Sequence, residues 1–445
     1  MGTDESFHPL GEAWEAHLEA VLEESDFDAE LGMALARDAQ RVTKGELSEA
    51  VFHDRYHEAV EDEFGVDDRP TEAAWREALA GADVELAGDV DRRAVLAGGA
   101  GLFGAGIITA GDDGDEDGAA AENGADAFEE ETDGVQWGMT LDLETCDGCL
   151  SCVTACSEEH NTSTGAHWMY ILAYDDATTD SPEPDEYDDI RDFQYLIRPC
   201  QHCEDAPCEK VCPTTARHTR LKDGLVLTDY DICIGCRYCQ VACPYGVNYF
   251  QWGHPDVPAD ELDEDHVISE EGRPVDSRPQ RGTMGKCTFC PTRQDGLKGD
   301  DLVGRTACED ACPPGAIQFG NLNDPDSVVR QYAENPALGR ARELLDDVDE
   351  DDQEELEEAI DVAAGDLDPD EANLDEEEAQ NILEDVAGGE ASTFRLLEEI
   401  GTNPNIVYIG NEPGPDAEQV DHWIDYEDIG EVDVRKDELD RFTLG

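Results

Sequence analysis

Apolar residues in the N-terminal part of the chain recur at the three- to four-residue spacing of an amphipathic helix. Trp14 and Leu18 follow this spacing, and it returns over residues 47–64. A short stretch with two Asp residues and a Pro then interrupts the pattern. Residues 1–80 are therefore predicted to form a small helical N-terminal domain, in which Thr71 caps a further short helix.

A second helical pattern lies in the acidic residues 331–393. Leu356 and Ile360 are four residues apart there, among many Asp and Glu residues. We interpret this stretch as an acidic helical insertion. Beyond it, residues 394–445 form a C-terminal segment, in which 405–409 has the β-branched and aromatic composition of a strand.

Two histidines, His53 and His57, lie four residues apart in the helical pattern over residues 47–64. Imidazoles at this spacing lie on one face of a helix, where they could bind a metal ion together. No cysteine is near them in the sequence, so we interpret both as surface histidines.

Residues 88–137 separate the helical N-terminal domain from the rest of the chain. Arg92 and Arg93 precede an uncharged run rich in Gly and Ala over 94–110, and this arrangement resembles a twin-arginine export signal. Such signals normally start near the N-terminus. A soluble Gly-rich linker and a short membrane-anchoring helix are the alternatives. The acidic remainder is predicted to be a flexible linker.

The chain has 445 residues, with 111 Asp or Glu against 29 Lys or Arg and a formal net charge of −82. Nucleic-acid binding is excluded, since neutralising phosphates requires clustered basic residues. The long uncharged run is shorter than the ~20 residues that span a bilayer, which excludes a multi-pass membrane protein. Acidic residues could mark disordered tails. Because they are spread over every region, we interpret them instead as adaptation to concentrated salt.

The 16 cysteines all lie between residues 146 and 312, in four groups of four. The groups are Cys146, Cys149, Cys152 and Cys156; Cys200, Cys203, Cys208 and Cys212; Cys233, Cys236, Cys239 and Cys243; and Cys287, Cys290, Cys308 and Cys312. The last three groups end in Cys-x3-Cys-Pro. This is an internal fourfold repeat with no cysteine left over.

Three other chemistries compete with an iron–sulfur interpretation of these groups. Disulfides suit an exported protein with an even cysteine count, but CxxCxxC places three sulfurs on one short loop, which suits one inorganic core. Zinc would fit the fourth group alone, yet that group shares its ending with the others. A redox dithiol requires only a single CxxC pair, so it does not account for the fourfold repeat. Thiolates are the soft ligands that iron–sulfur cores select, and CxxCxxCxxxCP is the bacterial ferredoxin signature.

The spacing also predicts how the groups pair. The first three cysteines of a group face one cluster, and the fourth lies on a following helical turn that faces another. Sixteen thiolates then make four [4Fe–4S] clusters. We predict an α+β fold in which two tandem bacterial-ferredoxin-like dicluster units occupy residues 138–330.

These motifs resemble the four-cluster electron-transfer subunits of molybdopterin oxidoreductases of the DMSO reductase type. The similarity extends over about residues 138–330 and resumes near 394–410, and it includes the runs 198–203, 231–239 and 285–290. The long N-terminal domain and the acidic insertion depart from the common pattern of this family.

The resemblance implies a set of ligands for each cluster. The four sets are Cys200, Cys203, Cys208 and Cys243; Cys233, Cys236, Cys239 and Cys212; Cys146, Cys149, Cys152 and Cys312; and Cys287, Cys290, Cys308 and Cys156. Some members of the family replace one cysteine and carry a three-iron cluster. Every position is Cys in this chain, so four cubane clusters are expected.

Several other side chains lie beside the cysteines in sequence. Four are cations that could either raise cluster potentials or form ordinary ion pairs, namely Lys210, Arg237, Lys286 and Arg293. His202 is interpreted as a packing or hydrogen-bonding residue, because its group already has four sulfurs. Three aromatic residues are expected to shield clusters from water, namely Tyr238, Tyr245 and Phe289.

The resulting hypothesis is a non-catalytic subunit that relays electrons in anaerobic respiration between a molybdopterin-containing catalytic subunit and a quinone-linked membrane anchor. The alternatives are a hydrogenase or formate dehydrogenase subunit and a free polyferredoxin. No catalytic residue is identified. If the twin-arginine segment is used, the protein would lie on the outer face of the cytoplasmic membrane. Otherwise it would be membrane-associated in the cytoplasm.

Overall fold

The protein is described by a computed structural model. The described residues are 11–70, 134–175, 194–262, 276–345, 348, 350–369, 372–389, 391–414, 417–419 and 426–430. The twin-arginine-like segment and the short helix expected after Thr71 lie outside them. Within the described part of the chain, no helix combines the length and the apolar character needed to cross a bilayer.

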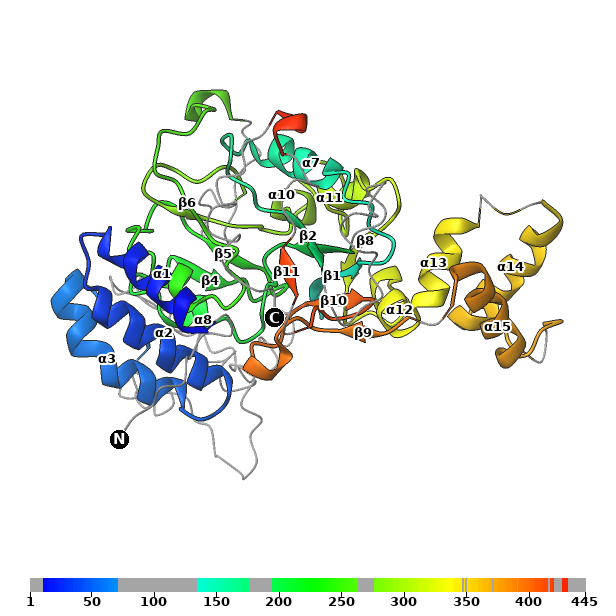
Figure 1. Ribbon diagram of the computed structural model, residues 1–445, viewed down its shortest axis with the longest axis horizontal. Helices are drawn as coiled ribbons and strands as arrows, with labels where there is room; N and C mark the ends of the chain where they lie inside the picture. Colours follow the sequence, from blue (N-terminus) through cyan, green and yellow to red (C-terminus); the bar gives the residue numbers. More distant parts are fainter. Residues whose placement is uncertain are drawn as a thin grey trace, which may run out of the picture.

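A four-stranded mixed sheet lies on the side of the main body next to α12 (Val328–Glu334) (Figure 1). Its strands, in spatial order, are β8 (Ile317–Asn321), β1 (Trp137–Asp142), β10 (Ile406–Ile409) and β9 (Thr393–Phe394). Strand β1 pairs antiparallel with β8 and parallel with β10. The strand predicted from residues 405–409 is thus confirmed, and it lies beside the strand that precedes the first cysteine.

Short sheets and helices build the rest of the cysteine-bearing body. The sheets comprise β2 (Tyr170–Asp175), β3 (Gln194–Arg198) and β11 (Glu418–Gln419); β4 (Arg217–Thr219) and β5 (Val226–Thr228); and β6 (Tyr249–Phe250) and β7 (Met284–Gly285). The helices are α7 (Ser151–His160), α8 (Pro207–Lys210), α9 (Tyr238–Ala242), α10 (Pro291–Gln294) and α11 (Ala307–Asp310). Each helix contains or directly follows a cysteine. The mixture of short helices and small sheets confirms the predicted α+β class.

Three helices of the N-terminal part pack on the cysteine-bearing body (Figure 1). They are α1 (Gly11–Glu23), α2 (Ala29–Thr43) and α3 (Glu49–Phe64). The Asp28 side chain caps α2 and that of Ser48 caps α3, each accepting from a backbone N–H in the first turn. Contacts to α8 and α9 come mainly from α2. His53 is buried, so the interpretation of it as a surface residue is wrong; its Nδ1 lies 2.9 Å from the carbonyl oxygen of Pro70.

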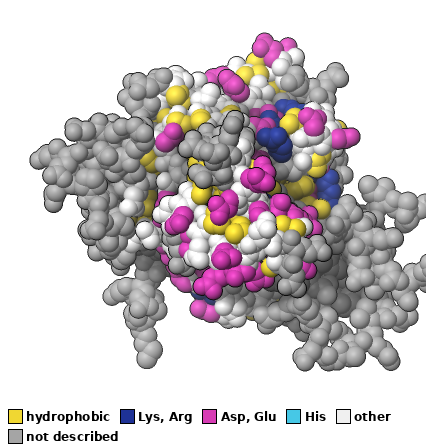
Figure 2. All heavy atoms as spheres, turned by 90° about the vertical axis from the view of Figure 1, so that its right-hand side faces the viewer, with side chains coloured by type: hydrophobic (Ala, Val, Ile, Leu, Met, Phe, Trp, Pro, Cys, Tyr) yellow, Lys and Arg dark blue, Asp and Glu magenta, His cyan; other side chains and the backbone are white. Residues whose placement is uncertain are grey.

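A further group of helices extends from the opposite end of the molecule (Figure 1). It comprises α12 (Val328–Glu334), α13 (Pro336–Leu344), α14 (Glu350–Ala364) and α15 (Glu376–Ala387). The last three share a hydrophobic core of their own, centred on Leu338, Leu356 and Leu383. Asp and Glu side chains dominate the charged surface at this end (Figure 2).

The remaining described elements are short. They are the 3-10 helices η3 (Ala259–Glu261), η4 (Asp300–Leu302), η5 (Glu398–Ile400) and η6 (Tyr426–Ile429). None of them carries a cysteine.

Candidate metal-cluster site

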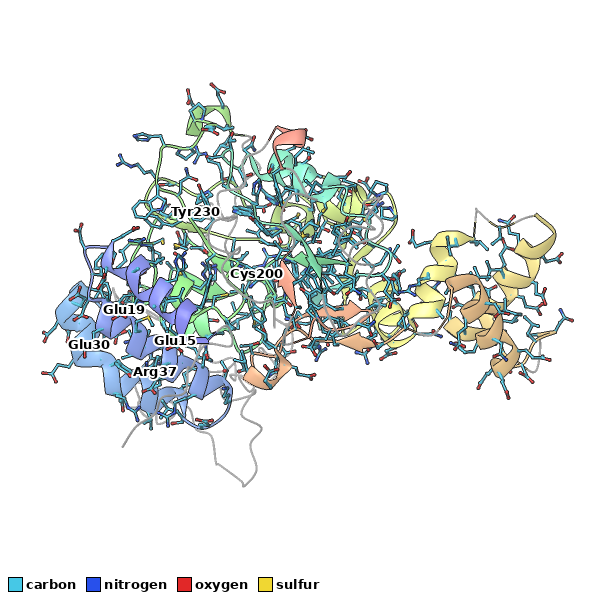
Figure 3. The ribbon with its side chains drawn as sticks, in the orientation of Figure 1. Glu15, Glu19, Glu30, Arg37, Cys200 and Tyr230 are labelled. Carbon is cyan, nitrogen blue, oxygen red and sulfur yellow. The ribbon has the colours of Figure 1, made fainter. Side chains whose placement is uncertain are left out.

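All the cysteines are free thiols, and most of them are buried in the main body. Cys200 lies near the middle of this body, whereas Glu15, Glu19 and Glu30 lie on the N-terminal helices (Figure 3). The disulfide alternative is therefore not realised. Bringing so many ionisable thiols into one protein core is unfavourable unless they bind something there.

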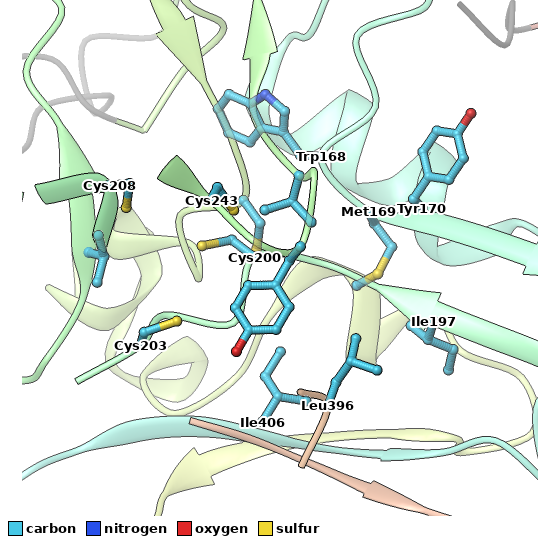
Figure 4. Packing of buried hydrophobic residues seen from close by; sticks show 14 of the residues in the cluster. Trp168, Met169, Tyr170, Ile197, Cys200, Cys203, Cys208, Cys243, Leu396 and Ile406 are labelled. Atoms are coloured by element: carbon cyan, nitrogen blue, oxygen red, sulfur yellow. The ribbon is translucent and has the colours of Figure 1, made fainter. Parts of the chain in front are cut away.

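Three cavities are each lined by four cysteines. Cavity A is lined by Cys212, Cys233, Cys236 and Cys239, cavity B by Cys200, Cys203, Cys208 and Cys243, and cavity C by Cys156, Cys287, Cys290 and Cys308. The space not filled by atoms, counted together with the adjoining open solvent, is about 330, 330 and 280 Å³, respectively. In every case, three cysteines come from one sequence group and the fourth from another. Figure 4 shows the four cysteines of cavity B, which approach from separate segments.

The four cysteines that line none of these cavities lie close enough together to interact electrostatically. They are Cys146, Cys149, Cys152 and Cys312. Burial raises the pKa of Cys146 to about 12, and the negative charges of Cys312 and Cys149 add to that effect. The same neighbours help to raise the pKa of Cys152, again after burial. We call this set site D. Because Cys149 is exposed and Cys146 and Cys312 are half-buried, site D lies at the surface.

Left-handed backbone conformations shape the loops that carry these sulfurs. Gly148 and Leu150 in the first group have positive φ, as do Gly235 and Arg237 in the third. A Cβ atom at Gly235 would overlap the carbonyl oxygen of Gly282, so only glycine fits at this point. Backbone N–H groups also approach the sulfurs; the N–H of Arg217, for example, lies 3.4 Å from Cys212 Sγ.

Three of the four cations singled out from the sequence form ion pairs with carboxylates. Lys210 Nζ lies 3.0 Å from Glu49, Arg293 pairs with Glu159 at 3.0 Å and with Asp310, and Arg237 Nη1 lies 3.9 Å from Glu24. Lys286 differs, because its ammonium group donates to the backbone carbonyl oxygens of Val226 and Cys287. The side chain of Lys286 lines cavity B.

A fifth cation, Arg217, escaped the sequence analysis. It is 1% exposed and lines cavity A, where Nη2 lies 3.7 Å from Cys239 Sγ and donates to Asn248 Oδ1 at 2.8 Å. Its Nε and Nη1 atoms have no hydrogen-bond partner among the described residues. Burial lowers the pKa of Arg217, but the charges of Cys239 and Cys208 outweigh that effect and raise it. A buried, incompletely paired guanidinium requires an anionic neighbour.

His202 has the packing and hydrogen-bonding role expected from the sequence. Its Nδ1 accepts the N–H of Val226 at 3.0 Å, so Nε2 carries the hydrogen and donates to the Cys287 carbonyl oxygen. The ring stacks on Phe289, with centroids 3.8 Å apart. Burial, followed by the charge of Lys286, lowers the pKa of His202 well below its usual range, which keeps the ring neutral.

The three aromatic residues have different surroundings. Tyr245 lines cavity B and Phe289 lines cavity C, while the Tyr238 hydroxyl donates to the Asp28 carbonyl oxygen of the N-terminal part at 2.7 Å. All three are 1% exposed, but only Tyr245 and Phe289 line a cavity, so the shielding role of Tyr238 stays a prediction. A histidine that sequence reasoning missed, His160, also lines cavity C, with Nε2 3.4 Å from Cys290 Sγ. Its position four residues after Cys156 was the available signal.

The cysteine sets suit a multi-atom core better than a single ion. Three of the sets surround a cavity, with the four sulfurs of each set around it. Soft sulfur donors, backbone N–H groups and buried cations together favour an anionic iron–sulfur core. The residues present therefore fit the cluster type that the cysteine spacing indicates.

Comparison with known families identifies three matching segments. Residues 191–263 and 232–317 match models described as 4Fe-4S dicluster domains. Residues 8–72 match one described as the N-terminal region of 4Fe-4S ferredoxin iron-sulfur binding. The N-terminal helices therefore accompany iron–sulfur domains in other proteins as well.

Curated relatives match somewhat less than half of the chain. A putative iron-sulfur subunit of dimethyl sulfoxide reductase from Halobacterium salinarum is 40% identical over 203 residues, which cover 44% of this chain and 71% of the relative. The arsenate respiratory reductase iron-sulfur subunit of a Shewanella species is 39% identical, over 44% of this chain and 86% of the relative. The menaquinone reductase iron-sulfur cluster-binding subunit of Nitratidesulfovibrio vulgaris is 33% identical, over 47% of this chain and 85% of the relative.

Proposed function

This chain belongs to the family of iron–sulfur electron-transfer subunits of respiratory reductases, and we propose that it relays electrons through four [4Fe–4S] clusters between a molybdopterin-containing catalytic subunit and a quinone-linked membrane anchor. When bound, each cluster supplies a one-electron redox couple. The protein itself holds the clusters, excludes water from them and adjusts their potentials.

The observation that carries this proposal is the exchange of cysteines between sequence groups. Cavities A, B and C each take three sulfurs from one group and one from another, which supports the ligand sets implied by the family resemblance. Site D completes the pattern with Cys146, Cys149, Cys152 and Cys312. We therefore assign four clusters and all 16 cysteines as ligands.

Each of the four sites has a neighbour among the others. Cys239 of cavity A affects the ionisation of Cys208 of cavity B, and Cys200 of cavity B affects that of Cys287 of cavity C. Cavity C and site D meet in the same way through Cys308 and Cys152. The order A–B–C–D thus supports stepwise transfer between neighbouring clusters.

Both ends of this series reach towards the protein surface. In cavity A, Cys212 and Cys233 are half-buried, and at site D, Cys149 is exposed, whereas every cysteine of cavities B and C is buried. Two accessible ends and an enclosed middle suit a subunit that exchanges electrons with two partners. The membrane attachment is assigned to a separate subunit, as in the quinone-linked arrangement proposed above.

The partners and the location can be tested together. We expect membranes of the source organism to yield this chain in a complex with a molybdopterin protein, and a soluble monomer would favour the free polyferredoxin instead. Replacing Arg92 and Arg93 by Lys should block export if the twin-arginine-like segment directs the protein to the outer face of the membrane. Unchanged location would contradict the export proposal without affecting the electron-transfer role.

Cluster content provides the direct test. Iron and acid-labile sulfide analysis of the full chain, isolated without oxygen, should give four clusters, and low-temperature EPR of the reduced protein should show interacting cubane signals. Iron for two clusters or fewer would contradict the assignment of four.

A further inference from the structure

Two buried cations lie on either side of cavity B. Arg217 lies at the junction with cavity A, and Lys286 lies at the junction with cavity C. Their surroundings differ from those of Lys210, Arg237 and Arg293, which have carboxylate partners.

Arg217 interacts electrostatically with two cavities. It contacts Cys239 of cavity A directly, with Nη2 3.7 Å from the sulfur, and it donates to the side chain of Asn248, which lines cavity B. Its described hydrogen-bond partners, Asn248 and the Cys239 sulfur, include no carboxylate. No described carboxylate neutralises the positive charge of Arg217, so this charge contributes to the electrostatic potential in both cavities.

Lys286 is placed similarly between cavities B and C. Its side chain lines cavity B, and its ammonium group donates to the carbonyl oxygen of Cys287, a cysteine of cavity C, at 2.9 Å. The other described acceptor is the carbonyl oxygen of Val226. Lys286 is 2% exposed, so water screens its charge little.

The other cations near the cysteine sites have carboxylates beside them that offset their positive charge. Arg293 near cavity C pairs with both Glu159 and Asp310, and Arg237 at cavity A pairs with Glu24. At site D, the carboxylate of Asp147 is a neighbouring charge that affects Cys146. Of the five cations described beside the cysteines, only Arg217 and Lys286 have no carboxylate among their described partners. Cavity B adjoins both, because Lys286 lines it and Arg217 donates to Asn248, which also lines it.

We infer that Arg217 and Lys286 are tuning residues that give the cluster of cavity B the highest reduction potential of the four, so that an electron entering the relay resides preferentially in its interior. This inference rests on the proposed function. Reduction adds one electron from the quinol-linked partner and breaks no bond, so one unit of negative charge appears inside the cavity. Nearby positive charge stabilises that added charge and raises the potential.

The test is an EPR-monitored redox titration of the full chain with its clusters, in three variants. Arg217→Gln should lower two midpoint potentials, those of A and B, and Lys286→Gln should lower those of B and C. One potential should therefore fall in both variants and one, that of site D, in neither. We expect the doubly affected potential to be the highest in the unsubstituted protein. Each shift should be at least tenfold in the reduction equilibrium, which is about 59 mV for one electron. Asn248→Asp should lower the same two potentials as Arg217→Gln. It leaves the guanidinium of Arg217 in place but gives it a carboxylate partner that offsets its charge.

Matched controls separate this effect from general damage. Lys222→Gln removes a half-exposed lysine that pairs with Asp295, and should leave all four potentials unchanged. Lys286→Arg and Arg217→Lys keep the charge and should keep the potentials. If a glutamine variant loses iron, Asn248→Asp and Lys286→Met provide the same comparison.

Two results would overturn the inference while leaving the proposed function intact. One is four cubane signals whose potentials do not change when the buried charges are removed at full iron content. The other is a highest potential that responds to only one of the two residues. Absence of four cubane signals from the unsubstituted protein would instead contradict the proposed function itself.

Discussion

At the scale of single residues, the position of a cysteine in the sequence does not by itself indicate which cavity it lines. Cys208 and Cys212 are four residues apart in the same group, yet they line cavities B and A, respectively. The short helix α8 separates them, because Cys208 lies within it and Cys212 follows it. One helical turn thus distributes the ligands of one group between two cavities.

Replacing single cysteines should reveal this exchange. Cys212→Ala should affect the cluster of cavity A and Cys243→Ala that of cavity B, although each residue belongs to the sequence group that supplies the other cavity. Iron analysis with EPR should show loss or conversion of a different cluster in each variant. Loss of the same signal in both would contradict the assigned ligand sets.

Arg340 provides a second test at this scale, because it connects α13 to the loop that carries Cys146. Its guanidinium donates to Asp142 at 2.6 and 2.9 Å, and Asp142 is fully buried and also accepts the N–H of Thr145. Arg340→Ala should therefore lower unfolding stability by about 3–5 kcal/mol, since it leaves a buried carboxylate without its partner. Thermal unfolding measures this loss.

An exposed arginine provides the control for that substitution. Arg330 forms an i,i+4 pair with Glu334 on the surface of α12. Arg330→Ala should cost no more than about 1 kcal/mol, because pairs of this kind contribute little in water. Equal losses in both variants would show that burial of Asp142 does not govern the effect.

At the scale of elements, the N-terminal helices lie against the two cavities nearest to them. Gly32 of α2 lies beneath the ring of Tyr238 at the start of α9, where an added Cβ atom would come within 2.7 Å of that ring. Lys210 at the end of α8 pairs with Glu49 of α3. These contacts cover the outer face of α8 and α9, the helices that carry Cys208 and Cys239.

A larger side chain at Gly32 should separate the two parts. Gly32→Val should expose the junction, increasing both cleavage of the N-terminal part in limited proteolysis and the rate of oxygen damage to the clusters of cavities A and B. Gly253→Ala is the matched control, because nothing lies within 4 Å of the added atom. Unchanged proteolysis of Gly32→Val would show that the helices tolerate displacement without undocking.

The sequence predicts local features of this fold well and distant contacts poorly. Cysteine groups and N-terminal helices depend on spacing within a few residues, so they can be recognised directly. The approach of Arg217 to Cys239, by contrast, depends on how β4 packs beside α9, and the parallel pairing of β1 with β10 joins segments far apart in the chain. No local pattern encodes either contact.

At the scale of the whole molecule, the net charge of −82 contrasts with the few cations kept inside. Asp and Glu dominate the charged surface at the end of the molecule that carries α13 to α15 (Figure 2), while Arg217 and Lys286 are buried beside the cavities. Repulsion between surface carboxylates opposes folding in dilute buffer, and dissolved salt screens it.

Stability should therefore increase with salt concentration. We expect the midpoint of thermal unfolding to rise steadily between dilute buffer and molar potassium chloride, with the clusters intact throughout. Full stability in dilute buffer would contradict salt adaptation. A parallel titration with sucrose, which is uncharged and is excluded from the protein surface, would distinguish charge screening from solute exclusion.

The order of the cysteine groups along the chain has a consequence for biosynthesis. In the proposed ligand sets, groups two and three supply cavities A and B, and groups one and four supply cavity C and site D. One pair of sites is therefore enclosed within the other in sequence. As the chain leaves the ribosome, the inner pair is complete once Cys243 has emerged, while the outer pair waits for Cys312. Cluster insertion can thus proceed from the inside outwards, and the first group remains a set of unligated thiols until synthesis of the cysteine-bearing region is almost finished.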